Sequence, residues 1–359
     1  MKKPFVDPTQ TDEGWQAVFA FQIFHQQPED WLKMRWGFNA GILLEEALDR
    51  GKLFVESQTA SEIDFRSGAQ PVRTVALRGI NLPGTGLQMS LLGKTIAQSR
   101  QAAEETALVY ARELYSTFPS DFILIPAETP DDFHRLSGQD LLTSQPGIAQ
   151  IQRSIFPLPP GVEFHFLTGL WQASARSNEQ IWRALSNMPR KSMVNMMMQP
   201  TYFFEGEKKA LIEIKQKILD AEQNSHIASV HGPWVENIVK RRLAAWKRFF
   251  LVQVHVAAEH ELDENLIRSI GSALTRDSND LSLPGFQTQW PDSDETGRSW
   301  CDQLLALNFI PSAHMEDLCD SDEAFAVFRV PYLPEAGVPG ANFIRLLQEL
   351  PPDRPQQGQ

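Results

Sequence analysis

The segment that most constrains the fold is FFLVQVHVAAE, residues 249–259, because apolar side chains alternate there more regularly than elsewhere in the chain. Every second residue from position 250 to 256 is apolar, as on the buried face of a strand. Apolar residues recur at helical spacing before it, in 234–247, and after it, in 263–274. These patterns predict a helix, a half-buried central strand and a second helix.

The rest of the chain also mixes strand-like and helix-like patterns. Thr95 and Gln98 form a T-x-x-Q pattern, which is typical of a helix start, and 81–93 is interpreted as a loop because of Pro83, Gly84 and Gly86. The predicted strands are 15–24, 52–56, 72–80, 122–125, 162–171, 193–199 and 286–290, and the predicted helices are 39–48, 94–118, 129–136, 178–185 and 203–222. We therefore predict an α+β fold in which helices pack on mixed β-sheets.

Prolines and charge suggest how the chain divides. The sequence FPLPPG at 156–161 interrupts every periodic pattern and is interpreted as a hinge. We expect one α+β subdomain at 1–155 and a second at 162–291 around the central strand, each an α/β sandwich. Residues 292–359 are acidic and end in PPDRPQQGQ, which predicts an acidic connector and a disordered tail.

Charge and cysteine content narrow the class of protein. A net charge of −12 argues against a surface that wraps nucleic acid, although it leaves room for a local basic face. Two cysteines, Cys301 and Cys319, give neither a disulfide framework nor a zinc-ligand spacing and fit a reducing compartment. No apolar stretch suits a signal peptide or a membrane span. We expect a cytoplasmic protein without a membrane span.

One string is similar to a phosphate-binding loop. In GTGLQMSLLGKT, six residues separate Gly86 from Gly93, whereas a Walker A loop has four, and Gln88 occupies the position that requires glycine. Pro83 also interrupts the approach from the preceding strand. We expect Thr95 to cap a helix here, with no nucleotide bound.

Metal and thiol chemistry have little support in the sequence. His255 and His260, with Glu259 beside them, lie at one strand end, and a metal site needs three or four convergent ligands. His165 and the methionines at 193, 196, 197 and 198 fit sheet packing better than a cofactor site. Cys301 and Cys319 have no recognisable His and Asp partners. We expect no cofactor.

The clearest candidate for a binding surface is a basic run. Its members are Lys240, Arg241, Arg242, Trp246, Lys247 and Arg248. Together they could present cations and a stacking ring to a phosphate backbone or to an acidic partner. The alternative is an ordinary solvated helix face, with Leu243, Ala244 and Trp246 forming the buried stripe.

Several longer phrases carry a family resemblance. They are GKTIAQSRQAAEETALVYARELYSTFPSDFILIPAETPDDFHRL, IWRALSNMPRKSMVNMMMQPT, FFLVQVHVAAE and AFAVFRVPYLPEAGVPG. From about Val72 onward the chain resembles the amino-terminal, non-motor region of bacterial HerA/FtsK-superfamily ATPases, which include conjugative type IV secretion ATPases. In such proteins a segment like FRVPYLPEAGVPG, here 328–340, directly precedes the ATPase core.

The resemblance implies a function without ATP hydrolysis by this chain. Walker A, Walker B and the arginine finger are missing, and ATPase activity would need a core supplied after these residues. It implies a non-catalytic accessory or assembly module that recognises a partner or substrate of a DNA-translocating motor and works in an oligomer. Net charge does not indicate DNA binding. The alternatives are a protein-interaction scaffold unrelated to nucleic acid and a metal-dependent enzyme using His165, His255, Glu259 and His260.

Overall fold

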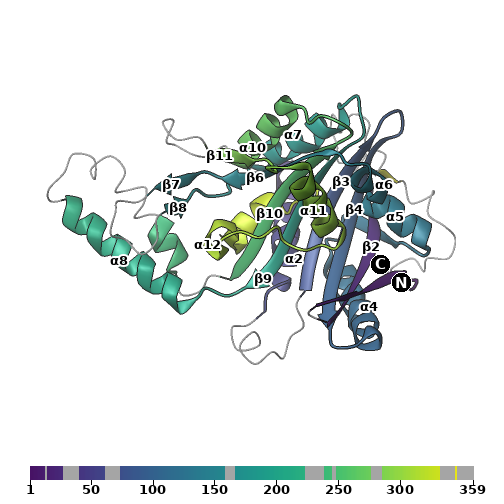
Figure 1. The fold of residues 1–359 in the computed structure, drawn as a ribbon, viewed down its shortest axis with the longest axis horizontal. Coiled ribbons are helices and arrows are strands. Elements are labelled where there is room, and N and C mark those ends of the chain that lie inside the picture. The colour runs from purple at the N-terminus through teal and green to yellow at the C-terminus, as the bar shows by residue number, and fades with distance from the viewer. Residues whose placement is uncertain are drawn as a thin grey trace.

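The computed structural model describes residues 1–12, 14–26, 40–60, 73–157, 166–222, 238–244, 248–275, 285–331 and 344–345. Within these residues the chain has an α+β fold built on one large, almost entirely antiparallel sheet (Figure 1). Its main path runs β1-β2-β4-β3-β9-β10-β6-β11, with β5 and β13 pairing with β2 and β12 pairing with β10. Only β13 pairs in parallel among the described strands.

The strands of this sheet are β1 (Val6–Thr11), β2 (Gly14–Gln26), β3 (Arg73–Leu82), β4 (Gly86–Ala97), β5 (Phe122–Pro126), β6 (Gly147–Arg153), β9 (Ser192–Thr201), β10 (Phe249–Ala258), β11 (Phe286–Gln289), β12 (Leu318–Asp320) and β13 (Ile344–Arg345). A separate pair is formed by β7 (Ile155–Pro157) and β8 (Phe166–Thr168). The predicted central strand is confirmed as β10, which is bordered by β9 and β6. It is buried on both faces, however, and not half-buried as its alternation indicated, because helices cover both sides of the sheet.

Helices cover both faces of the sheet. On one face lie α2 (Ala40–Ser57), α4 (Arg100–Thr117), α7 (Ala175–Ser186), α10 (Glu264–Leu274) and α13 (Ser321–Val327). On the other lie α5 (Pro130–Ser137), α6 (Gln139–Thr143) and α11 (Asp294–Leu305). Near the end of β10, α8 (Glu205–Glu222) and α12 (His314–Asp317) belong to a third, smaller apolar cluster. Figure 1 shows α8 extending away from the main body.

Three local predictions were wrong. Residues 52–56 belong to helix α2, because a short apolar run does not distinguish a strand from a buried helix segment. Residues 86–97 form strand β4, buried along most of its length, after a tight turn at 83–85, so the apolar run shows no alternation. Thr95 therefore lies in a strand, and α4 begins after Ser99, whose side chain accepts a hydrogen bond from the Ala102 N–H.

Strands from both predicted subdomains lie in the same sheet. β3, from the first, pairs with β9, from the second, over seven residue pairs, with Arg78 opposite Asn195. The hinge predicted at 156–161 therefore does not separate two sheets. Residues 158–165, which include most of that hinge, lie outside the described residues, as do 234–237 and 245–247 of the predicted basic helix.

The acidic connector predicted at 292–359 is largely built into the fold. Residues 294–327 contain α11, α12, β12 and α13, and Trp300, Leu304 and Phe325 are buried. Acidic residues occupy the first turns of α11 and α13, where they favour helix starts. The tail predicted to be disordered, PPDRPQQGQ, lies outside the described residues. No described helix has the length and apolar character needed to cross a membrane.

A row of polar side chains crosses the sheet face beneath α5, α6 and α11. Its centre is Arg78, which is fully buried. Arg78 donates to Asn195 Oδ1 at 2.9 Å, to the Leu304 carbonyl at 2.8 Å and to the Ser137 carbonyl. In strand order the row contains Gln22, Ser90, Arg78, Asn195, His255, Gln150 and Gln289. Arg78 thereby fixes the carboxyl ends of α5 and α11 to the sheet.

Candidate functional site

The predicted basic run is divided between internal ion pairs and solvent. Arg241 donates to the Asp320 carboxylate at 2.5 and 2.8 Å. Arg242, only 2% exposed, donates to both carboxylate oxygens of Glu323. Lys240 and Arg248 are exposed, whereas Trp246 and Lys247 lie outside the described residues. Arg241 and Arg242 therefore hold the fold together at this position. Lys240 and Arg248 are exposed, and Arg248 also donates to the Glu56 carbonyl at 2.9 Å.

The ion pairs belong to a buried group, here called the Glu323 cluster, which consists of Glu323, Asp320, Arg153, Arg241 and Arg242. Glu323 is fully buried, and its carboxylate accepts hydrogen bonds from Arg153, at 2.9 Å, and from Arg242. The second terminal nitrogen of Arg153 donates to the Glu316 carbonyl at 2.5 Å. The cluster thus joins β6, the segment at 241–242 and the start of α13.

Helix α13 starts with a capping box that shares the same carboxylates. Asp320 Oδ1 accepts the backbone N–H groups of Asp322 and Glu323, both at 3.0 Å, and Glu323 Oε2 accepts the Asp320 N–H at 3.1 Å. Burial raises the pKa of Asp320, but the hydrogen bonds and charge of Arg241, with the charge of Arg242, outweigh it and hold that pKa well below its ordinary value.

Residues 314–331 are the part of the predicted acidic connector that follows α11, and only this part is called the connector from here on. It is also attached to the sheet through strand pairing. β12 pairs antiparallel with β10, and Phe249, Phe250 and Leu251 lie opposite residues 320, 319 and 318. Lys52 Nζ of α2 also forms an ion pair with Asp322 Oδ1, at 2.6 Å. The connector is therefore held by backbone hydrogen bonds, buried charges and an ion pair to α2.

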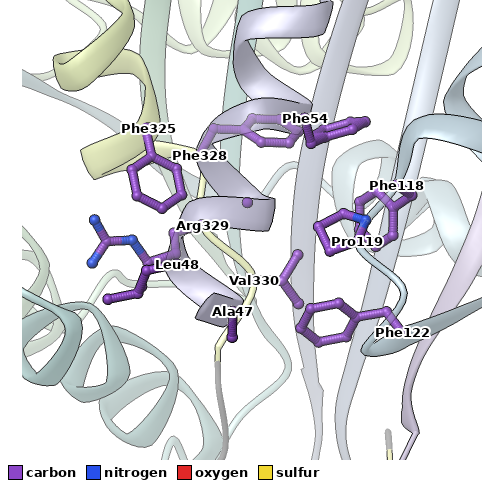
Figure 2. Close-up of a pocket in the computed structure, with 11 residues that line it drawn as sticks. Ala47, Leu48, Phe54, Phe118, Pro119, Phe122, Phe325, Phe328, Arg329 and Val330 are labelled. Carbon is purple, nitrogen blue, oxygen red and sulfur yellow. The ribbon is translucent and has the colours of Figure 1, made fainter. Parts of the chain in front are cut away.

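The carboxyl-terminal end of the connector forms one wall of an aromatic pocket (Figure 2). The pocket contains about 430 Å³ of empty space, part of it open to solvent. Phe54 stacks on Phe328 with ring centroids 6.2 Å apart, and Phe118 packs edge-on against Phe54 at 5.0 Å. The lining is Ala47, Leu48, Gly51, Phe54, Phe118, Pro119, Phe122, Phe325, Phe328, Arg329 and Val330.

Arg329 is the charged residue of this pocket. Its guanidinium carbon lies 4.3 Å from the centroid of the Phe325 ring, a cation–π contact. Burial lowers the pKa of Arg329 to about 10. In Figure 2 its guanidinium group lies on the Phe325 side and extends away from Phe118 and Phe122. The lining of the pocket is thus apolar except for Arg329, whose guanidinium group lies beside Phe325.

The described residues considered for a metal site are His255, Glu259 and His260. His255 is buried within β10, and burial together with the charge of Arg78 lowers its pKa to about 3, so its imidazole is neutral. Glu259 and His260 follow the strand, and His165 lies outside the described residues. Within the described part of the chain, no group of three His, Cys, Asp or Glu residues is placed to hold a metal ion.

The remaining sequence candidates have structural positions. Lys94 of the GKT string is buried in β4 and donates to Asn308 Oδ1 at 2.6 Å, so this segment is a strand and not a phosphate-binding loop. Cys301 and Cys319 are both buried. Burial, with the charge of Asp302, raises the pKa of Cys301 to about 11, and burial also raises the pKa of Cys319. Neither thiol is activated as a nucleophile.

Sequence reasoning missed Arg153, Asp320 and Glu323 as members of a buried ion-pair cluster. A local signal was present, because D-S-D-E at 320–323 fits a capping box before the apolar run AFAVF. No local signal pointed to Arg153, which is 170 residues away from Glu323. No protein-family model matches the chain, and no curated protein matches it.

Proposed function

We propose that this chain is an accessory and assembly module for a HerA/FtsK-like DNA-translocating ATPase, and that ATP hydrolysis is supplied by the motor. The observation that carries the proposal is the attachment of the connector to the sheet through β12 and the Glu323 cluster. The family resemblance puts the ATPase core after 328–340. A motor joined there would be held in a fixed orientation relative to the sheet.

Physical reasons support an anchoring role for the connector. A buried carboxylate shared by two arginines has directional hydrogen bonds on both oxygens, which restrict the position of the helix that carries it. The capping box fixes the first turn of α13 on the same group. This arrangement would fix the orientation of a neighbouring domain and would not take part in its chemistry.

Partner recognition is assigned to the exposed part of the basic run. Lys240 and Arg248 remain at the surface after Arg241 and Arg242 are used internally. They can contribute to the on-rate and specificity for an acidic partner or for DNA without changing the core. The aromatic pocket lies at the other end of the connector and offers an apolar surface to the same assembly.

The test is affinity purification of the tagged full-length chain from its native host, followed by mass spectrometry. We expect recovery of a P-loop ATPase, and we expect Lys240→Glu combined with Arg248→Glu to reduce that recovery. Arg268→Glu, on the exposed surface of α10, is the matched control and should leave recovery unchanged. Purification without any ATPase would overturn the proposed function.

A second candidate is a protein-interaction scaffold that has no nucleic acid in its biology. The net charge of −12 favours it. The two functions differ in the purified complex, because a scaffold would be recovered with other partners and would show no salt-dependent retention on DNA.

A further inference from the structure

Three side chains that no motif identifies meet near the base of α8. Thr201 is the last residue of β9, His314 is the first residue of α12 and Glu207 lies in the first turn of α8. His314 Nε2 is 3.0 Å from Thr201 Oγ1, and His314 Nδ1 is 2.7 Å from Glu207 Oε1. A hydroxyl, an imidazole and a carboxylate therefore lie in line within hydrogen-bonding distance.

The carboxylate decides the direction of these hydrogen bonds. Glu207 can only accept, so Nδ1 of a neutral His314 carries the proton and donates it. Nε2 then has a free lone pair, and Thr201 Oγ1–H must donate to it. The basic nitrogen of the imidazole therefore accepts the proton of the Thr201 hydroxyl, whose oxygen could act as a nucleophile.

The group is largely buried and lies beside the first turn of α8. The side chains of His314 and Glu207 are 17% and 9% exposed, and Phe204, which is 38% exposed, stacks on the imidazole at 4.1 Å. Lys208 N donates to the Phe204 carbonyl, so Phe204 precedes the first turn of α8 and has no side-chain oxygen to cap it. A side chain at Gly206 would meet nothing within 4 Å, so the space beside that turn is open.

We propose that Thr201, His314 and Glu207 form a hydrolytic site for small esters with an apolar acyl group. Thr201 Oγ1 forms a bond to the acyl carbon as its proton moves to His314 Nε2. The carbonyl oxygen carries the negative charge and faces the open N–H groups of α8. His314 returns the proton to the leaving alkoxide as the ester bond breaks. A water then bonds to the acyl carbon as it gives a proton to His314 Nε2, and His314 passes that proton to Thr201 Oγ1 as the acid leaves.

The roles divide by contact. Thr201 and His314 touch the reacting atoms and are catalytic residues. Glu207 is a positioning residue, because it fixes the Nδ1–H tautomer and its other oxygen accepts the Phe204 N–H at 3.1 Å. Phe204 and Tyr202, whose ring centroids are 4.8 Å apart, provide an apolar wall for the acyl group. This activity is independent of the proposed assembly function.

The test uses the purified full-length chain and 4-nitrophenyl acetate. We expect steady-state hydrolysis and an acetyl adduct on Thr201 after acid quenching, located by peptide mass spectrometry. Thr201→Val keeps the shape but removes the hydroxyl, so we expect a loss of about 100-fold or more in kcat/KM and no adduct at position 201. Thr143→Val, at an exposed position in α6, is the matched control and should leave the rate unchanged.

Two further variants separate catalysis from structure. Thr201→Ser should retain both the rate and the adduct, and Glu207→Gln should lower kcat about tenfold or more with little change in KM. Circular dichroism and thermal unfolding check that each variant is folded. If acetylation occurs only at other residues, or if Thr201→Ser and Glu207→Gln fold normally without these effects, the group is a structural contact and the proposal is wrong.

Discussion

Two regions of the molecule bury arginine completely, and they stabilise the charge in different ways. In the Glu323 cluster, Arg153 and Arg242 share one buried carboxylate. Arg78 has no carboxylate in its hydrogen-bond set and instead donates to Asn195 and to two carbonyls near the ends of α5 and α11. Helix carboxyl ends carry partial negative charge, which offsets the cation.

This difference predicts which of the two regions changes its stability with pH. Carbonyl and amide oxygens do not titrate, so the Arg78 contacts keep their strength at any moderate pH. Carboxylates do titrate, and the pKa of Asp320 in the Glu323 cluster is held below its ordinary value, mainly by Arg241. The connector is therefore expected to be the acid-sensitive part of the fold, whereas the helices held by Arg78 are not.

The largest effect is expected for Glu323→Gln. It leaves Arg153 and Arg242 buried without a carboxylate, and loss of one partner from a buried ion pair costs about 3–5 kcal/mol. Urea unfolding followed by circular dichroism measures the free energy of unfolding. Glu295→Gln, at an exposed position in the first turn of α11, is the control. A loss below about 1 kcal/mol would show that the cluster contributes little.

Arg78→Met is expected to cost less, about 2–3 kcal/mol, because it removes the buried charge together with its hydrogen bonds and leaves only neutral acceptors unpaired. The cost should be the same at pH 5 and pH 8, since none of the three acceptors titrates. Urea unfolding at both pH values checks this. A cost that changes strongly with pH would contradict the contrast between the two regions.

Asp317→Asn tests the sign of one pKa shift. Asp317 accepts from Gln253 at 2.7 Å and from Ser312, and burial raises its pKa to about 6. The folded pKa lies above the unfolded value of 3.8, so its favourable contribution is complete below pH 4 and is lost as the pH rises through 6. The variant should gain about 1–2 kcal/mol at pH 7.5 and nothing at pH 3.5.

The pKa of Asp320 is shifted in the opposite direction to that of Asp317. Its folded pKa lies below 3.8, so its contribution is present above that pH and disappears as the pH falls further. Unfolding curves of Asp317→Asn and the wild type at pH 7.5 and pH 3.5 measure the contribution of Asp317 alone, because Asp320 is present in both. Equal stabilisation at both pH values would mean that Asp317 is not buried as a charged group at neutral pH.

The smallest effect is expected at the surface. Lys240→Glu and Arg248→Glu should each change the free energy of unfolding by less than about 0.5 kcal/mol, because both residues are exposed. The same urea assay measures this. Arg242→Glu is the contrasting variant and should destabilise strongly, since it puts a carboxylate against Glu323. Similar losses from all three would contradict the division of the basic run.

The sequence predicted what local periodicity determines. The strands around residues 193–199 and 249–259 and the helices around 178–185 and 263–274 are confirmed. Helical spacing predicted the buried face of each helix, whereas both strands are short apolar runs buried on both faces. Strand β4 was missed because Pro83, Gly84 and Gly86 indicated a loop, whereas they form the tight turn that leads into the strand and its first residue. The pairing of β3 with β9 and of Arg153 with Glu323 depends on contacts between distant segments, which local patterns do not encode.

The most direct test of the central claim is native-state hydrogen exchange of the connector. If β12 and the Glu323 cluster fix the connector to the sheet, the amides of residues 319–327 should exchange as slowly as those of β10, and Glu323→Gln should accelerate them selectively. Rapid exchange of these amides in the wild-type chain, with β10 still protected, would show that the connector is not anchored and would remove the basis for the assembly function.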